Sequence, residues 1–205
     1  MGGKLHFPNR KGDDRMKALI LCDKESSLFC GVDLRSHAQA AVIEAGSEAE
    51  IVDLDGDQIA PCLGCFQCWT KTPGLCIQTH DCANRVAGQE IQSDVVIFLS
   101  KITYGGYSYD IKAFLDRSIP NISPFFENVH GETHHKMRYE RFPYMMTIGY
   151  GEYTARERET FIRLAERNAR NMRPPKHFVY TARNADEVNE TIRSLKNALL
   201  CEVRL

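Results

Sequence analysis

The sequence predicts an α/β protein in which helices cover both faces of a five-stranded parallel sheet. Short apolar runs of strand length alternate with amphipathic segments of helix length through most of the 205 residues. One of these runs, residues 94–100, is almost unbroken, as expected of a strand that is buried on both faces. Because parallel strands need crossover connections, this alternation predicts a three-layer sandwich with the helices outside.

The first half of the chain contains the first three predicted strands. The apolar run KALILCD at 17–23 predicts the first strand, and LRSHAQAAVIEAG at 34–46 predicts the helix after it. EAEIVDLD at 48–55 predicts the second strand. DCANRVAGQEIQS at 81–93 predicts a helix, and DVVIFLS at 94–100 predicts the third strand.

The second half continues the same alternation. YDIKAFLDRSI at 109–119 has apolar residues at helical spacing, and YMMTIGYG at 144–151 predicts the fourth strand. TARERETFIRLAERNARNM at 154–172 predicts a helix that two prolines stop. HFVYTA at 177–182 predicts the fifth strand, and ADEVNETIRSLKNALL at 185–200 predicts the last helix.

Length and composition indicate one domain of ordinary globular type. Apolar residues make up 43% of the chain and charged residues 26%. We expect a polar N-terminal arm at 1–16 and a single domain at 17–205, which includes a cysteine-rich loop at 61–82 and an insertion at 120–142.

Charge and hydrophobicity argue against two classes of partner. The net charge is −1, and the 26 basic residues are interspersed with 27 acidic ones, so we expect no nucleic-acid partner. No segment approaches the roughly 20 apolar residues that a membrane span needs, and the start lacks the apolar core of a signal peptide. We therefore expect no membrane association and a cytoplasmic protein.

Four of the eight cysteines lie close together in CLGCFQCWTKTPGLC at 62–76. Disulfides do not persist in a reducing cytoplasm, so these thiols are interpreted as metal ligands or redox thiols rather than as disulfide partners. The isolated cysteines are interpreted as small apolar residues that fill the interior. These are Cys22, Cys30, Cys82 and Cys201.

The predicted topology indicates where a ligand would bind. In a five-stranded sheet of order 2-1-3-4-5, strand order reverses between the first and third strands, and ligands bind beyond the carboxyl ends of the strands at that point. The loops that follow Cys22, Ser100 and Gly149 are therefore the candidate positions.

The segment SDVVIFLSKITYGGYSYDIKAFLDRS at 93–118 resembles the flavodoxin-like NAD(P)H-dependent FMN reductases and iron-sulfur flavoproteins. In that family an apolar strand runs into a turn with a tyrosine and small residues and then into a similar helix. The resemblance extends with lower specificity over most of residues 17–200. It implies a flavodoxin-like fold, bound FMN, NAD(P)H as electron donor, a homodimer or homotetramer, and in some cases a ferredoxin-like redox partner.

The turn after the third strand contains residues that can contact a flavin directly. Gly105 and Gly106 let the backbone approach a flat ring, and Tyr104 and Tyr107 can cover its face. A tight strand-to-helix turn explains the same residues without a ligand. The resemblance favours the flavin and implies the following cofactor-binding residues: Ser26, Ser27, Thr103, Tyr104, Gly105, Gly106, Tyr107, Ser108, Gly149, Tyr150 and Gly151.

The loop after the first strand departs from the family pattern. Family members have glycine, serine, proline and arginine there, followed by hydroxyl residues that hold the FMN phosphate at a helix N-terminus. This chain has CDKESSLFCGVDLRSH at 22–37, in which serines, Lys24 and Arg35 could still contact a phosphate. Ser26 or Asp33 could equally be a helix cap.

The iron-sulfur flavoproteins carry a compact cluster motif after the second strand. Here Cys62, Cys65, Cys68 and Cys76 give Cys-x2-Cys-x2-Cys-x7-Cys, which is compatible with a [4Fe–4S] cluster. Zinc could use the same four sulfurs, and many reductases of the wider family keep similar cysteines as free thiols. A [4Fe–4S] cluster, a zinc ion and free thiols are therefore all compatible with these four cysteines.

The predicted function is an FMN-dependent oxidoreductase or electron-transfer flavoprotein, reduced by NAD(P)H, with a [4Fe–4S] cluster beside the flavin. The flavin and the cluster supply the redox chemistry, so no side chain is assigned as a catalytic acid or base. The alternatives are a flavodoxin-like electron carrier without a hydride substrate and a zinc-stabilised regulatory module.

Overall fold

The structure is a computed structural model that describes residues 15–203. Most of the predicted polar arm, 1–16, therefore lies outside the described residues. The central sheet has the order β2-β1-β3-β6-β7, and every pair of neighbours is parallel. Its strands are β1 (Lys17–Cys22), β2 (Glu48–Asp53), β3 (Val95–Lys101), β6 (Tyr144–Tyr150) and β7 (His177–Ala182). Since β6 and β7 are the fourth and fifth strands of the sheet, the predicted order 2-1-3-4-5 is confirmed.

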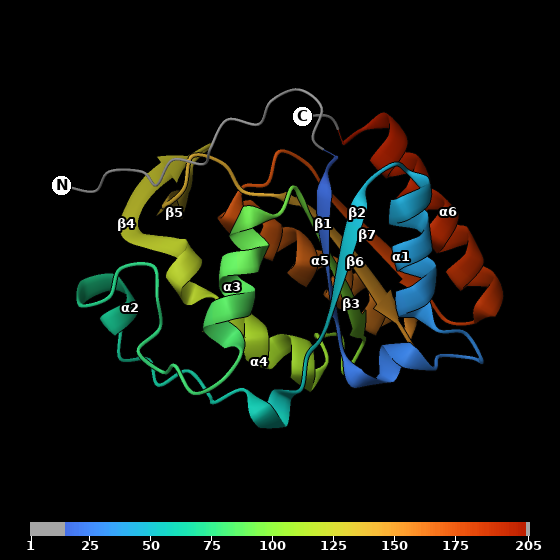
Figure 1. The fold of residues 1–205 in the computed structure, drawn as a ribbon, viewed down its shortest axis with the longest axis horizontal. Helices are drawn as coiled ribbons and strands as arrows, with labels where there is room; N and C mark the ends of the chain where they lie inside the picture. Colours follow the sequence, from blue (N-terminus) through green and yellow to red (C-terminus); the bar gives the residue numbers. More distant parts are fainter. Residues whose placement is uncertain (1–14, 204–205) are drawn as a thin grey trace.

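Helices cover both faces of the sheet (Figure 1). One face is covered by α1 (Leu34–Glu44) and α6 (Ala185–Cys201). The other is covered by α3 (Ala83–Gln92), α4 (Tyr109–Arg117) and α5 (Ala155–Met172). The three-layer sandwich is therefore confirmed, with α1, α3, α4 and α5 in the connections between parallel strands and α6 after the last strand.

Strand β3 shows why the apolar run at 94–100 forms the centre of the sheet. Val95, Ile97 and Leu99 face the α1 and α6 layer, and Val96 and Phe98 face the opposite layer. All five side chains are at most 1% exposed. Alternating side chains point to opposite faces of a strand, so burial on both faces requires an unbroken apolar run.

The insertion at 120–142 forms a hairpin, which the sequence did not predict. Strands β4 (Ile122–Val129) and β5 (Glu132–Met137) pair antiparallel in a separate two-stranded sheet. The turn residues His130 and Gly131 both have positive φ, at 53° and 85°, as the tight turns of hairpins require. In Figure 1 the hairpin lies on the same flank of the molecule as the short helix α2 (Gln67–Thr70) of the cysteine-rich segment.

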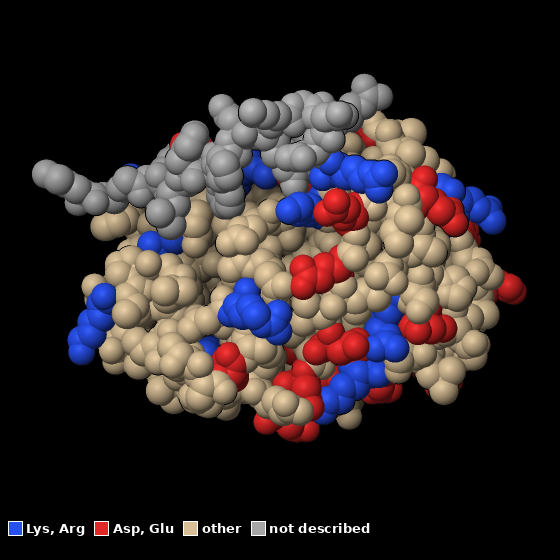
Figure 2. All heavy atoms as spheres, in the orientation of Figure 1, with Lys and Arg blue, Asp and Glu red and all other residues tan. Residues whose placement is uncertain are grey.

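Three single-turn 3₁₀ helices complete the secondary structure: η1 (Lys24–Ser27), η2 (Gly56–Gln58) and η3 (Ile119–Asn121). Acidic and basic side chains are interspersed over the face of the molecule seen in Figure 2. Among the described residues, none of the helices combines the length and the apolar character that a bilayer crossing needs.

Candidate functional site

The carboxyl ends of β1, β3 and β6 meet at one edge of the sheet. The N–H of Asp23 donates to the carbonyl of Leu99 at 3.3 Å, and the N–H of Ile102 donates to the carbonyl of Tyr150 at 2.8 Å. The first loop (residues 23–33), the turn at 103–106 and the segment after β6 all leave the sheet at this edge. This is where the topology predicts a ligand.

Asp23 is the first residue after β1, and its carboxylate is buried in the centre of this edge. The side chain accepts hydrogen bonds from the N–H of Ser26 at 3.1 Å, from the N–H of Lys101 at 2.6 Å and from the Tyr150 hydroxyl. Burial raises the pKa of Asp23 above its usual value, and these donors oppose the rise. The protein's own carboxylate thus receives the donors that a bound anion would use.

The hydroxyl groups and the cation of the first loop are also engaged within the protein. The buried Ser26 Oγ donates to the carbonyl of Asp23 at 2.6 Å, and Ser27 Oγ donates to the carbonyl of Lys24 at 3.1 Å. The Lys24 ammonium pairs with Asp55 at 2.6 Å. A phosphate would have to displace these contacts.

The N-terminus of α1 is closed by a carboxylate as well. Asp33 accepts hydrogen bonds from the N–H groups of Arg35 at 3.1 Å and Ser36 at 3.3 Å, as an N-cap residue does. The Arg35 guanidinium pairs with Asp53 at 2.7 Å. In the arrangement that the structure describes, the first loop therefore does not fit a phosphate group.

The residues of the turn after β3 have different roles. Thr103 and Gly106 exchange two backbone hydrogen bonds of 3.0 and 2.8 Å. Tyr104 has φ of 51° and is 93% exposed, so its ring is free to cover a ligand. A Cβ on Gly105 would lie 3.0 Å from the Thr160 Cβ, so this glycine allows the turn to approach α5.

Tyr107 and Ser108 face the interior. The Tyr107 ring contacts Phe161 edge-on, with 5.3 Å between ring centroids, and burial raises the pKa of its hydroxyl to about 12. The N–H of Ser108 donates to Ser100 Oγ at 2.9 Å. In this position the Tyr107 ring belongs to the core and is not available to a ligand.

Side chains also pack closely around the carboxyl end of β6. A Cβ on Gly149 would lie 2.4 Å from a ring carbon of Phe161, so close helix contact explains this glycine. The Tyr150 ring is 1% exposed and directs its hydroxyl to Asp23. Gly151 has φ of 116°, which favours glycine, and lies beside Lys101. The predicted cofactor residues therefore share one edge, although several of their side chains point inward.

The cysteine loop (residues 61–82) is closed at its base by a buried ion pair. The Arg117 side chain at the end of α4 is 0% exposed and pairs with Asp81, which is 2% exposed, at 2.6 Å. Arg117 also donates to the carbonyls of Ala60 at 2.6 Å and Gln78 at 3.0 Å. Burial acts to raise the pKa of Asp81, but the guanidinium and backbone donors hold it below its usual value.

The four clustered thiols lie at the surface of this loop. Cys62 and Cys65 are exposed, Cys68 and Cys76 are half-buried, and all four are free of disulfides. Burial, and then the nearby thiols of Cys76, Cys62 and Cys65, raise the pKa of Cys68. The four thiols are thus within electrostatic reach of one another. Residues 15–203 nevertheless contain no group of three or more His, Cys, Asp or Glu side chains arranged to hold a metal ion.

The isolated cysteines divide into two kinds. Cys22 is buried, and Cys82 is half-buried at the start of α3, so both fit the predicted role in filling the interior. Cys30 and Cys201 are exposed, and the same prediction is wrong for them. Both lie outside the sheet, in a loop and at the last turn of α6, where no apolar layer covers them.

A row of aromatic rings joins the cysteine loop to the hairpin. Phe66 stacks on Trp69 at 5.1 Å, Trp69 contacts His135 at 5.4 Å, and His135 contacts Phe126 at 4.5 Å between ring centroids. The Trp69 indole N–H donates to the carbonyl of Ile122 at 3.1 Å. The insertion at 120–142 therefore supports the cysteine loop.

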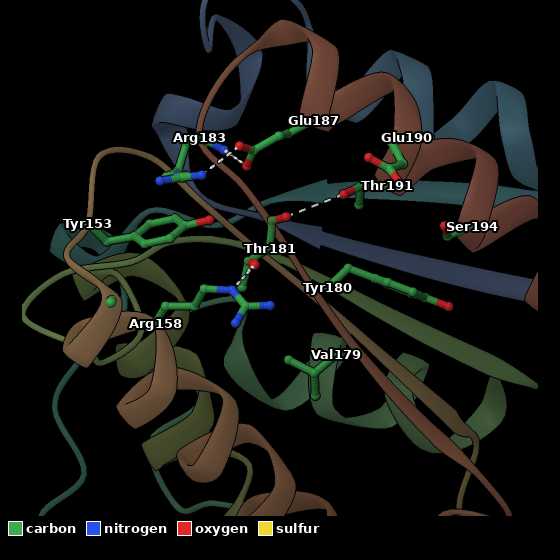
Figure 3. Close-up of a pocket in the computed structure, with 11 residues that line it drawn as sticks. Tyr153, Arg158, Val179, Tyr180, Thr181, Arg183, Glu187, Glu190, Thr191 and Ser194 are labelled. Atoms are coloured by element: carbon green, nitrogen blue, oxygen red, sulfur yellow. Dashed lines mark hydrogen bonds and ion pairs between the residues drawn. The ribbon is translucent and has the colours of Figure 1, made fainter.

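A separate hollow of about 530 Å³ lies at the outer edge of β7 (Figure 3). Arg158 donates from Nε to Thr181 Oγ1 at 2.9 Å, and Arg183 pairs with Glu187 at 3.0 Å. The hollow shares no residue with the cysteine loop. Because acidic and basic side chains balance one another in it, we assign it no ligand.

The chain is similar in sequence to a known protein over part of its length. No family model matches the chain. The chain is 32% identical over 80 residues to an iron-sulfur flavoprotein of Methanocaldococcus jannaschii. The matched segment covers 39% of this chain and 40% of that relative, so the match spans less than half of either protein.

Two solved structures share the fold. An NAD(P)H:quinone oxidoreductase from Methanothermobacter marburgensis aligns with a TM-score of 0.65 and 10% identity, over 91% of this chain and 96% of that one. An FMN-dependent NADH-azoreductase from Bacillus anthracis, solved in complex with FMN, aligns with a TM-score of 0.61 and 10% identity, over 92% and 100%. The chain has the flavodoxin-like fold. The comparisons support the resemblance to flavodoxin-like NAD(P)H-dependent FMN reductases and iron-sulfur flavoproteins.

Sequence reasoning missed the residues that organise this edge. Asp23 follows the first strand directly, in the loop that departs from the family pattern, and this departure was the available signal. Asp81 and Arg117 are 36 residues apart, and the sequence contains no sign that they pair.

Proposed function

We propose that this protein is an FMN-dependent oxidoreductase or electron-transfer flavoprotein that is reduced by NAD(P)H, with the cysteine loop as a second redox site. The observation that carries the proposal is a four-cysteine loop that follows β2 of a flavodoxin-like sheet, in a chain that matches an iron-sulfur flavoprotein over 80 residues. When bound, a flavin can accept a hydride as two electrons and return the electrons singly. The chain itself would position the flavin at the carboxyl edge of the sheet and the second redox group in the cysteine loop.

The hydrogen-bond donors of the first loop are already engaged within the protein, and this limits how FMN can bind. Because its donors are engaged by Asp23, Asp33 and neighbouring carbonyls, this loop does not hold the FMN phosphate as it stands. Flavin would then bind mainly through its ring, against the exposed Tyr104. We derive no catalytic step through the flavin from this arrangement.

Titration with FMN and with riboflavin, which lacks the phosphate, tests this account. We expect the two ligands to bind with affinities within about tenfold of each other, a difference of about 1.4 kcal/mol. The measurement is quenching of flavin fluorescence on addition of protein. Absence of binding by both ligands would reject the flavoprotein proposal, whereas a much stronger affinity for FMN would show that the first loop opens.

Anaerobic mixing with reduced nicotinamide nucleotides tests the reductase activity. Bound flavin should lose its visible absorbance when NADH or NADPH is added in a stopped-flow instrument. Inertness toward both nucleotides, combined with rapid reduction by ferredoxin, would instead assign an electron carrier.

We propose a [4Fe–4S] cluster for the cysteine loop because its donor set has the required chemistry. Cys62, Cys65, Cys68 and Cys76 supply four thiols near one another. Reconstitution with iron and sulfide under anaerobic conditions should bind about four irons per chain. Serine at any of these four positions should weaken iron binding, and Cys82→Ser is the matched control. Binding of zinc alone would assign a structural metal site.

A cytoplasmic, homo-oligomeric protein is part of the same proposal. All eight cysteines are free, which suits a reducing compartment. The hairpin exposes Phe125 and Phe126, at 64% and 59%, which suits a subunit contact. Sedimentation of Phe125→Ser against wild type tests the contact, and an unchanged monomer in both would reject it.

A further inference from the structure

Asp23 lies where three strands of the sheet end, and its carboxylate accepts from three separate elements. The Ser26 N–H of η1 donates to it at 3.1 Å, and the Lys101 N–H at the end of β3 donates at 2.6 Å. The Tyr150 hydroxyl at the end of β6 also donates. Lys101 and Tyr150 are 78 and 127 residues from Asp23 along the chain. Donors that converge in this way at the carboxyl edge of a parallel sheet form a binding position for an anion.

The local role of Asp23 explains one of these contacts and not the other two. Asp23 is the N-cap of η1, and that role needs only the Ser26 N–H. The residue is 1% exposed, so its carboxylate is enclosed by the protein rather than turned to solvent. Burial of a charge is costly unless hydrogen bonds compensate it, and here the donors of η1, β3 and β6 do so. The chain therefore fills this anion position with its own carboxylate.

Other polar groups around the first loop have carboxylate partners as well. Asp110 of α4 is 9% exposed and accepts from the Lys24 N–H at 3.1 Å and the Gly56 N–H at 2.8 Å. Three cations around the loop are paired: Lys24 with Asp55, Lys101 with Glu25 and Arg35 with Asp53. A phosphate dianion at this loop would compete with these carboxylates for the same donors and cations. Asp23 differs from the others because it takes the donors of three elements at once.

We propose that Asp23 determines the flavin specificity of this site, because its carboxylate fills the anion position at the end of β1 and excludes the phosphate of FMN. The inference rests on the proposed function, since it requires a flavin at this edge of the sheet. It assigns the selection against phosphate to one side chain rather than to the loop as a whole. Removal of that carboxylate should open the position to a small oxyanion and let the protein distinguish FMN from riboflavin.

Formate tests the anion position without any flavin. Asp23→Ala keeps the Cβ and removes a group with the shape and charge of formate. We expect excess sodium formate, compared with sodium chloride of the same ionic strength, to raise the melting temperature of Asp23→Ala by at least about 2 °C. Wild type and Asp57→Ala, which lacks an exposed carboxylate of the same region, should not respond. Equal responses of the three proteins would overturn the proposal.

Fluorescence titration with FMN and riboflavin tests the specificity. The ratio of the two affinities should rise at least about tenfold in Asp23→Ala, since hydrogen bonds to a charged group then favour FMN. Asp23→Asn keeps the shape of the side chain and an acceptor oxygen, so the position stays filled and the ratio should stay at the wild-type value. Asp57→Ala should also leave it unchanged. An unchanged ratio in Asp23→Ala, or an equal rise in Asp23→Ala and Asp23→Asn, would reject the proposal.

The two measurements separate this proposal from the proposed function. If the wild type binds neither flavin, the flavoprotein proposal fails, whereas the formate measurement still decides whether Asp23 fills an anion position. If Asp23→Ala does not fold in chloride, refolding in formate is the measurement. Recovery of the folded protein in formate alone would support the anion position, and failure to fold in both salts would reject it.

Discussion

The first loop and the cysteine loop each contain a buried aspartate, but the two carboxylates have different partners. Asp23 in the first loop accepts from backbone N–H groups and hydroxyl groups, and burial raises its pKa. Asp81 in the cysteine loop pairs with the Arg117 guanidinium, which outweighs burial and lowers its pKa. The presence or absence of a cationic partner therefore decides whether the pKa of a buried aspartate is lowered or raised.

The two loops show how one fold can engage the donors of one loop internally and keep the thiols of another loop at or near the surface. The first loop satisfies its own donors and buries its carboxylate, so it presents little to a ligand. The cysteine loop satisfies its base through Arg117 and presents its thiols outward. The predictions below test the two loops against each other.

The largest effect is expected at the charged pair. Asp81→Ala leaves Arg117 buried without its counterion and should lower the free energy of unfolding at pH 7 by about 3–5 kcal/mol. Because the folded-state pKa of Asp81 is lowered, its stabilisation is present above the usual aspartate pKa and is lost as pH falls through the folded value. Urea unfolding measures both effects.

The control for this prediction is a surface pair in the adjoining helix. Asp116→Ala removes an exposed i,i+4 partner of Lys112 and should change stability by less than about 0.5 kcal/mol. A similar loss for Asp81→Ala and Asp116→Ala would mean that the buried pair does not hold the cysteine loop.

Glu90 extends the comparison to a buried acid with no cationic partner. It lies on α3, accepts from Asn121 Nδ2 at 2.8 Å, and burial raises its pKa from 4.5 to about 7. Since its folded-state pKa is raised, stability is lost as pH rises from 4.5 to 7. Glu90→Gln should therefore be more stable than wild type by up to about 3 kcal/mol at pH 8. The gain should disappear near pH 4, and parallel pH curves for the two proteins would contradict the prediction.

Asp23→Ala should show a smaller loss with the opposite pH trend to Asp81→Ala. Removal of the carboxylate takes an acceptor away from the Lys101 N–H, the Ser26 N–H and the Tyr150 hydroxyl, and should lower stability by about 2 kcal/mol. The raised pKa means that the stabilisation from Asp23 decreases as pH rises above the usual aspartate value, so the deficit should be larger at pH 4 than at pH 7. Asp57→Ala, at an exposed pair with Lys24, is the control.

The smallest effect concerns the turn at 103–106, which follows β3. Gly105→Ala should cost about 1 kcal/mol, because φ is +77° and the new Cβ would meet Thr160 at 3.0 Å. Gly106→Ala should be nearly neutral for stability, since its nearest contact is 3.4 Å. If the turn faces the flavin, Gly106→Ala should still weaken flavin binding. Equal melting temperatures for the two variants would reject the assigned role of Gly105.

The sheet could be predicted because its signal is local. Most strands of the sheet are short apolar runs that precede a helical segment, and β3 needs apolar residues on both faces. The hairpin β4–β5 carries polar and aromatic residues with an irregular register near Ile122 and Phe126, so it lacks the apolar alternation of a strand. It contacts Trp69 of the cysteine loop and forms ion pairs with arginines at the end of α5, and these partners are distant in the sequence.

The site could be predicted only in part, for a physical reason. Family resemblance and topology predicted a site at the carboxyl edge of the sheet, and four cysteines within 15 residues predicted a second one in the cysteine loop. The closure of the first loop by Asp23 and the pairing of Asp81 with Arg117 depend on which side chains meet after folding. The spacing of residues along the chain does not show which side chains come into contact in the folded protein.

The position of Trp69 gives the protein a built-in optical reporter. It is the chain's single tryptophan, stacked on Phe66 within the cysteine loop and hydrogen-bonded to the hairpin. Detachment of the loop from the hairpin would move the indole into water and shift its emission to longer wavelength. A metal bound by the adjacent thiols would quench that emission. Changes at the cysteine loop can therefore be followed in real time without any label.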